Sequence, residues 1–216
     1  SFYDFVCEVG RHHRATLDGL IGRIESIEGA EAFLQARESK RGAVLVTAHF
    51  GNFEVGLAAM REKEERVHVV FQRDRMSRFE QIRSDLHRQL GIVETPIDDG
   101  MASWLALRDA LSADGVVMLQ GDRVMPGQKG LAVPFFDGRI ELPIGPAKLA
   151  LMTGAPLIPV FAVRQGGGRV RIVLGRPIEV ADAHAVEPAL REVAGAMQRV
   201  IAQHPEQWHV LHRAFG

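Results

Sequence analysis

A histidine and a glutamate flank a Gly-Asn pair in the stretch TAHFGNFEVG, residues 47–56. His49 follows a run of apolar residues, and Glu54 opens a segment rich in helix-forming residues. A carboxylate bonded to one imidazole nitrogen fixes the ring tautomer and stabilises the imidazolium that forms when the other nitrogen takes a proton. The pattern therefore predicts a general base at His49, oriented by Glu54. The alternative is a loop histidine beside an ordinary capping acid.

The elements around this motif should bring the two side chains together. The run AVLVT at residues 43–47 is typical of a buried strand, and a helix is expected over residues 53–65. Asn52 is then a suitable N-cap residue, and Glu54 lies in the first helical turn, where the helix dipole favours its ionised form. His49 would lie beyond the C-terminal end of the strand, where open α/β sheets bind their ligands.

Strands and helices alternate along the rest of the chain. Further strands are expected at residues 67–71, 116–119, 157–163 and 169–174. Further helices are expected at residues 76–90, 101–115, 146–154 and 183–203. The last two strands should form a hairpin across RQGGG, and residues 121–134 should form a loop. This alternation predicts a single-domain α/β sandwich with a mostly parallel central sheet, one antiparallel hairpin and flanking helices.

The whole chain, residues 1–216, is expected to form one domain. Residues 1–38 should be an N-terminal helical segment, whose second helix covers residues 29–37, and residues 40–215 should be the functional core. The first helix of that segment would carry Phe2, Phe5, Val6 and Val9.

Composition limits the function classes. A chain of 216 residues with 46% hydrophobic residues can bury a full core. The formal net charge of −1 gives no reason to expect a nucleic-acid partner. Arginine supplies most of the 26 cations, which is compatible with anionic substrates or phosphorylated lipids. The single cysteine, Cys7, excludes an internal disulfide. No apolar run reaches the roughly 18 residues that span a bilayer, and no signal-peptide pattern is found.

Four blocks of the sequence resemble one family. HFGNFE resembles the H-x-x-x-x-(D/E) signature of the lysophospholipid acyltransferase superfamily, and more closely the HFGNWE block of the lipid A biosynthesis (lauroyl/myristoyl-type) acyltransferases. The others follow in the order of that family: LQGDR (119–123), GLAVPFFDGRIELPIGPAKLALMTGAPLIPVFAVR (130–164) and HPEQWHVLHRAF (204–215). The chain departs from the usual pattern at Phe53, Arg123, Asp137 and Ala214. The N-terminal membrane helix usual in the family is not recognised in this sequence.

The resemblance implies an O-acyltransferase. It would move a fatty acyl group from a thioester donor, acyl-carrier protein or acyl-CoA, to a hydroxyl of a lipid or glycolipid such as a lipid A precursor. A phosphatidylinositol mannoside or another glycolipid is equally open as acceptor. No metal, cofactor or covalent enzyme intermediate is implied. His49 would deprotonate the acceptor hydroxyl and Glu54 would orient the imidazole. Backbone N–H groups around Gly51 and Asn52 are candidate donors to the oxyanion.

Further site residues follow from the same blocks. The resemblance implies that Asp122 organises the acceptor side or an arginine, with a strand-end cap as the alternative. Substrate binding is expected of Asn52, Arg73, Arg88, Asp122 and Arg123, and the alternative for Arg73 and Arg88 is a solvated surface. Phe135 and Phe136 are expected to contact the membrane or the acyl chain, with a core position as the alternative.

The implied location is peripheral, on the cytoplasmic face of the bacterial inner membrane. Two other functions remain open. A thioesterase would use a similar base to activate water and would release free acid without an acceptor. A non-catalytic lipid-binding relative would keep the fold but lose the His–Glu pair, which this sequence retains. No acid or cysteine cluster accompanies His12, His13, His209 or His212, so no metal site is expected. No G-x-S-x-G elbow supports a serine hydrolase.

Overall fold

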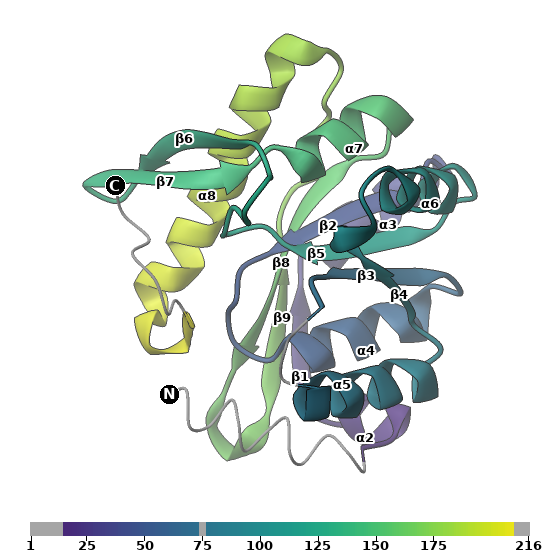
Figure 1. Ribbon diagram of the computed structural model, residues 1–216. Coiled ribbons are helices and arrows are strands. Elements are labelled where there is room, and N and C mark those ends of the chain that lie inside the picture. Colours follow the sequence, from purple (N-terminus) through teal and green to yellow (C-terminus); the bar gives the residue numbers. More distant parts are fainter. Residues whose placement is uncertain (1–14, 74–76, 210–216) are drawn as a thin grey trace.

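The computed structural model describes residues 15–73 and 77–209, without the side chains of residues 77–80 (Figure 1). The helix expected around Phe2 to Val9 lies outside the described residues. Within them, no helix is both long enough and apolar enough to cross a membrane.

A seven-stranded sheet runs through the molecule in the order β1-β9-β8-β2-β5-β3-β4. Its strands are β1 (Ile24–Glu28), β2 (Ala43–Thr47), β3 (Val67–Phe71), β4 (Val93–Pro96), β5 (Val116–Gln120), β8 (Leu157–Arg164) and β9 (Val170–Leu174). The strands β8, β2, β5, β3 and β4 are parallel to one another, whereas β9 is antiparallel to β8 and β1 pairs in parallel with β9. The predicted fold class and the β8–β9 hairpin are confirmed.

Helices cover both faces of the sheet. They are α2 (Leu17–Ile21), α3 (Ala30–Arg37), α4 (Phe53–Lys63), α5 (Ser77–Gln89), α6 (Met101–Ser112), α7 (Gly145–Thr153) and α8 (Val186–Gln203). Short 3-10 turns lie at η1 (Ile97–Asp99), η2 (Gly166–Gly168), η3 (Ala183–Ala185) and η4 (Pro205–Gln207). In Figure 1, α2, α4 and α5 lie on one side of the sheet and α6, α7 and α8 on the other.

The central strand β2 contributes side chains to both hydrophobic cores, one on each face of the sheet. Ala43 and Leu45 belong to the core beneath α4, whereas Val44 and Val46 belong to the core beneath α7 and α8. Successive side chains of a strand point to opposite faces, so a strand covered on both sides is apolar throughout. β2 is therefore fully buried, and the loop that follows it begins at the C-terminal edge of the parallel strands.

The structure corrects the expected segment boundaries in three places. Ile24–Glu28 is the edge strand β1 and not helix; its mostly exposed sequence IESIE lacks the apolar pattern of an inner strand. The four-residue strand β4 was missed because VETP is short and half polar. The expected loop at 121–134 runs into a second hairpin, β6 (Gly130–Phe135) with β7 (Gly138–Pro143), which packs beside α8 (Figure 1). Val133, Ile140 and Leu142 anchor this hairpin in the core.

Candidate active site

His49 lies just past the end of β2, in a loop whose conformation is fixed at Gly51 and at Asn52. Gly51 has a φ of 62°, and a Cβ there would collide with the carbonyl oxygen of Ala162, so the position requires glycine. Asn52 ends the loop by capping α4, because its side-chain oxygen accepts a hydrogen bond from Val55 N–H at 3.2 Å. The predicted N-cap is thus confirmed, and the histidine is held at the C-terminal edge of the sheet.

The imidazole of His49 is paired with Asp122, which follows β5. The Nδ1 atom of His49 lies 2.6 Å from Oδ1 of Asp122, and the backbone N–H of His49 donates to Oδ2 at 3.0 Å. The strands β2 and β5 are adjacent and parallel, so the residues after them meet at one edge. With Nδ1–H bonded to the carboxylate, Nε2 is left as the basic nitrogen.

Asp122 is held as a carboxylate. Its side chain is 2% exposed, and burial by itself would raise its pKa. The hydrogen bond and charge of His49, together with the indole N–H of Trp208, outweigh this effect and keep the pKa of Asp122 below its ordinary value. A buried carboxylate with three donors is well suited to orient an imidazole and to stabilise its protonated form.

The expected hydrogen bond between His49 and Glu54 is wrong. Glu54 lies in the first turn of α4, as predicted, but its Oε2 lies 2.9 Å from Nε2 of His87 on α5. The other ring nitrogen of His87 lies 2.7 Å from Glu94 on β4. The motif spacing does not show that the Gly51 turn directs His49 toward β5, whereas the first turn of α4 faces α5. The Glu54–His87–Glu94 cluster ties α4, α5 and β4 together.

The cluster should give the protein a distinctive pH dependence of stability. Burial lowers the pKa of His87, but Glu54 and Glu94 outweigh burial and raise it from 6.5 to about 9. Since the folded-state pKa is the higher one, this stabilisation is fully present below about pH 6.5 and is lost as pH rises toward 9. We expect the melting temperature of wild type to exceed that of His87→Gln clearly at about pH 6, and the gap to shrink by about pH 10. Exposed His184, changed to Gln, is the matched control. A gap that is constant across this range would contradict the assignment.

The candidate oxyanion donors in the loop are also corrected. The N–H of Gly51 donates to the carbonyl of Gln207 at 3.0 Å, and the N–H of Asn52 donates to the carbonyl of Ala162 at 2.8 Å. Both groups are committed to holding the loop in place. They therefore shape the turn after His49 and are not available to a reaction intermediate.

The C-terminal segment completes the site, and its contact with Asp122 was not predicted from the sequence. Trp208 Nε1 donates to Asp122 Oδ2 at 3.0 Å, and the N–H of His209 donates to the carbonyl of His49 at 2.7 Å. Gln207 exchanges hydrogen bonds with the backbone of Arg164 on β8 and so fixes the segment. The PEQW block carries a signal for this contact, because Trp208 follows polar residues there and its indole N–H can donate a hydrogen bond.

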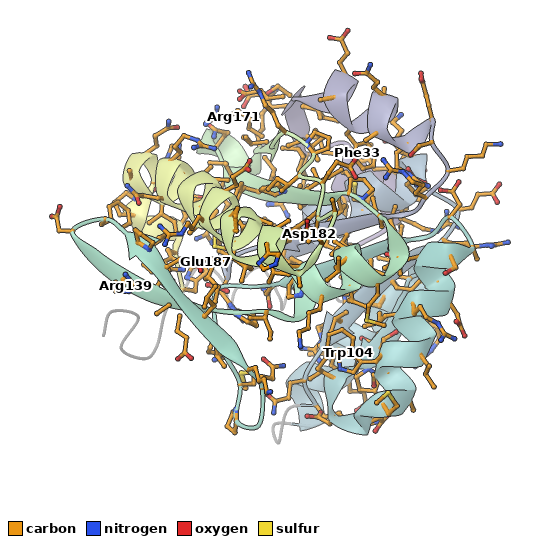
Figure 2. The ribbon with its side chains drawn as sticks, turned by 90° about the horizontal axis from the view of Figure 1, so that it is seen from above. Phe33, Trp104, Arg139, Arg171, Asp182 and Glu187 are labelled. Carbon is orange, nitrogen blue, oxygen red and sulfur yellow. The ribbon has the colours of Figure 1, made fainter. Side chains whose placement is uncertain are left out.

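A cavity of about 550 Å³ opens beside His49. It is formed by residues at the ends of β3, β4 and β5, by the loop after Asp122, and by α6 and the start of α7. Its apolar wall includes Val70, Phe71, Trp104, Leu107, Leu119 and Leu149. Figure 2 shows Trp104 on α6. The lining is predominantly apolar with a few polar groups, which is typical of a site for a largely hydrophobic ligand.

The other predicted site residues fall into two groups. Arg123 lines the cavity with His49. By contrast, Arg73 is paired with Asp99 at 2.7 and 2.9 Å, and Arg88 with Asp85 at 2.9 Å on the exposed side of α5. Among the described residues, neither these two arginines nor Asn52 lines the cavity.

The two phenylalanines differ in burial. Phe135 is fully buried, and its ring centroid lies 5.7 Å from that of Trp208, so it supports the indole that bonds to Asp122. The expected membrane or acyl contact of Phe135 is therefore wrong. Phe136 lies at the β6–β7 turn and is 41% exposed, so that expectation remains a prediction for Phe136 alone.

An α/β fold with a His–Asp pair beside an apolar cavity defines a class of proteins that can carry out base-assisted chemistry on a lipid-like ligand. The chain belongs to the bacterial lipid A biosynthesis acyltransferase family, which it matches over residues 4–216.

Three curated relatives with the same name are similar to this chain. Phosphatidylinositol mannoside acyltransferases of two Mycobacterium tuberculosis strains are 29% identical over 197 residues, covering 90% of this chain and 59% of theirs. The protein of that name from Mycolicibacterium smegmatis is 27% identical over 195 residues, covering 89% of this chain and 63% of its own. The chain thus spans about three fifths of the length of these relatives.

Proposed function

We propose that the protein transfers a fatty acyl group from a thioester donor, acyl-carrier protein or acyl-CoA, to a hydroxyl of a membrane glycolipid. The observation that carries the proposal is the 2.6 Å contact between His49 and Asp122 beside a largely apolar cavity. Family membership and the name of the relatives support the same reaction class. A phosphatidylinositol mannoside is the first acceptor to test, and a lipid A precursor is the second.

The proposed mechanism is direct transfer. Nε2 of His49 takes the proton of the acceptor hydroxyl, and the oxygen attacks the thioester carbonyl. Asp122 accepts the hydrogen bond from Nδ1–H throughout and balances the imidazolium charge. The tetrahedral intermediate collapses with loss of the thiolate, which receives the proton from His49. The products are an ester and a free thiol, and no covalent enzyme intermediate is needed.

The shape and lining of the cavity support the substrate class. Its apolar wall, which includes Trp104 and Leu149, suits an acyl chain, and burying each methylene of such a chain contributes about 0.8 kcal/mol. The reacting carbonyl would then lie near His49 at the polar end.

The direct test uses purified protein, a long-chain acyl-CoA and the glycolipid, with thiol release and mass spectrometry of the lipid measured together. We expect thiol release to depend on the acceptor and to match the ester formed. Thiol and free fatty acid released at the same rate without acceptor would indicate a thioesterase. Binding of the substrates with no thiol release under any condition would indicate a non-catalytic relative.

Peripheral binding to an anionic membrane, on the cytoplasmic face, is part of the proposal. Phe136 and Arg139 lie at the end of the β6–β7 hairpin, and Figure 2 shows Arg139 on this hairpin. An exposed ring beside a cation suits the membrane interface. We expect the protein to float with anionic vesicles, less so at high salt, and Phe136→Ala to weaken binding several-fold. Exposed Leu34 on α3, changed to Ala, is the control. Binding insensitive to salt and to Phe136→Ala would contradict this attachment mode.

A further inference from the structure

Three cationic residues of the described chain line the same cavity as His49. They are Arg123, Lys129 and Lys148. Arg123 and Lys129 belong to the loop after Asp122, and Lys148 lies on α7. Among the residues that the structure describes, the charged groups that line the cavity besides His49 are these three cations and Asp98. This described lining is positive on balance, although the chain as a whole carries a net charge of −1.

Within the described chain, the three cations have no carboxylate partner, in contrast to Arg37 and Arg41. Arg37 is bound by Glu64 and Asp114, and Arg41 is bound by Glu179. In the stretches that the structure describes, Arg123, Lys129 and Lys148 form no side-chain hydrogen bond or ion pair. All three are exposed, so they can meet a ligand at the cavity opening.

Asp98 does not neutralise them. Its Oδ2 atom accepts a hydrogen bond from the backbone N–H of Arg73 at 2.9 Å, which ties it to the segment after β3. The structure shows no ion pair between Asp98 and any of the three cations.

The backbone fixes the two lysines relative to each other. The N–H of Ile144 donates to the carbonyl of Lys129 at 3.1 Å, and the N–H of Lys148 donates to the carbonyl of Ile144 at 3.0 Å. Ile144 therefore joins the end of the loop to the first turn of α7. The backbone position of Arg123 is fixed separately, because the neighbouring Asp122 is hydrogen-bonded to His49 and Trp208.

We propose that Arg123, Lys129 and Lys148 form a phosphate-binding site at the cavity opening, next to the proposed catalytic histidine. A guanidinium can hold a phosphate with two parallel hydrogen bonds, and the two ammonium groups add point charges. The inference rests on the proposed function, since both substrates it invokes carry phosphate. The phosphate comes from the thioester donor (a phosphopantetheine or coenzyme A phosphate) or from the phosphodiester of the acceptor lipid.

Two triple variants test the site without relying on turnover. The site variant is Arg123→Gln, Lys129→Gln and Lys148→Gln. The control variant is Lys63→Gln, Arg169→Gln and Arg191→Gln, which removes three cations that carry surface partners away from the cavity. Both lose the same net charge, so general attraction to anions is matched. Thermal melts establish that both are folded.

Binding is measured in two arms. The donor arm uses calorimetry with coenzyme A and with phosphate-free pantetheine. The acceptor arm uses flotation with phosphatidylinositol vesicles and with vesicles of a neutral, phosphate-free glycolipid. We expect the site variant to lose about tenfold or more in affinity for the phosphate-bearing probe relative to the control variant, in the arm that supplies the phosphate. The phosphate-free probes should show no such difference.

Equal binding of the site and control variants in both arms would overturn the proposal. So would a loss that is just as large for the phosphate-free probes, since the cations would then act on something other than phosphate. These readouts do not need acyl transfer. A wild-type protein that transfers no acyl group would refute the proposed function and leave the binding comparison intact.

Discussion

His49→Ala is expected to lower the rate of the proposed acyl transfer by about 100- to 10,000-fold, the usual contribution of a general base. The loss should fall on kcat, because the imidazole takes a proton only as the acceptor attacks. The fold should persist, since the side chain of His49 is 30% exposed. Asp122 keeps two of its donors, the backbone N–H at position 49 and the indole of Trp208.

The measurement is the initial rate with acyl-CoA and glycolipid, together with a thermal melt. His184→Ala, at an exposed position on η3, is the control and should leave both unchanged. A folded His49→Ala protein with wild-type turnover would remove the base from the mechanism.

Asp122→Asn is expected to have an effect of similar or greater size, about 10,000-fold on kcat. The carboxylate of Asp122 accepts from His49 Nδ1 and N with its two oxygens and from Trp208 Nε1 as well. An amide has one oxygen, so it cannot serve all three donors. It also cannot balance an imidazolium charge. The KM values should change much less than kcat, because Asp122 is 4% exposed and does not line the cavity.

The melting temperature of Asp122→Asn is measured alongside its turnover, and Trp208→Phe is the control variant. A buried donor left without its acceptor costs about 1–3 kcal/mol, so Asp122→Asn should melt at a somewhat lower temperature. Trp208→Phe removes one donor to the same carboxylate and keeps the ring against Phe135. It should retain substantially more turnover than Asp122→Asn. Equal losses in the two variants would indicate that packing, and not the charge of Asp122, governs the rate.

Much of the fold could be predicted from local patterns. The run AVLVT is apolar without a break because β2 is covered on both faces, and that signal is unambiguous. The strands that the sequence does not predict lack such a signal. β1 is an exposed edge strand, and β6 and β7 form a small hairpin whose inward positions, such as Val133 and Ile140, alternate with exposed ones that are not uniformly polar.

The candidate site was predicted less completely, for a geometric reason. The sequence predicts that His49 and Asp122 each follow a strand, but not that these strands are adjacent or in which direction either side chain points. Glu54 was the nearer carboxylate in sequence, yet the helix that carries it faces His87. Trp208 reaches the site only because the chain returns after α8, which no local pattern indicates.

The most direct test of the account is the comparison of kcat for Asp122→Asn and Glu54→Gln, measured side by side and corrected for the folded fraction. Asp122 bonds to His49, whereas Glu54 bonds to His87. If Asp122 orients the catalytic base, Asp122→Asn loses orders of magnitude in kcat, whereas Glu54→Gln mainly lowers the melting temperature, with a loss of kcat at least about tenfold smaller. Near-normal turnover in Asp122→Asn, with a collapse of kcat in folded Glu54→Gln, would contradict this role of Asp122.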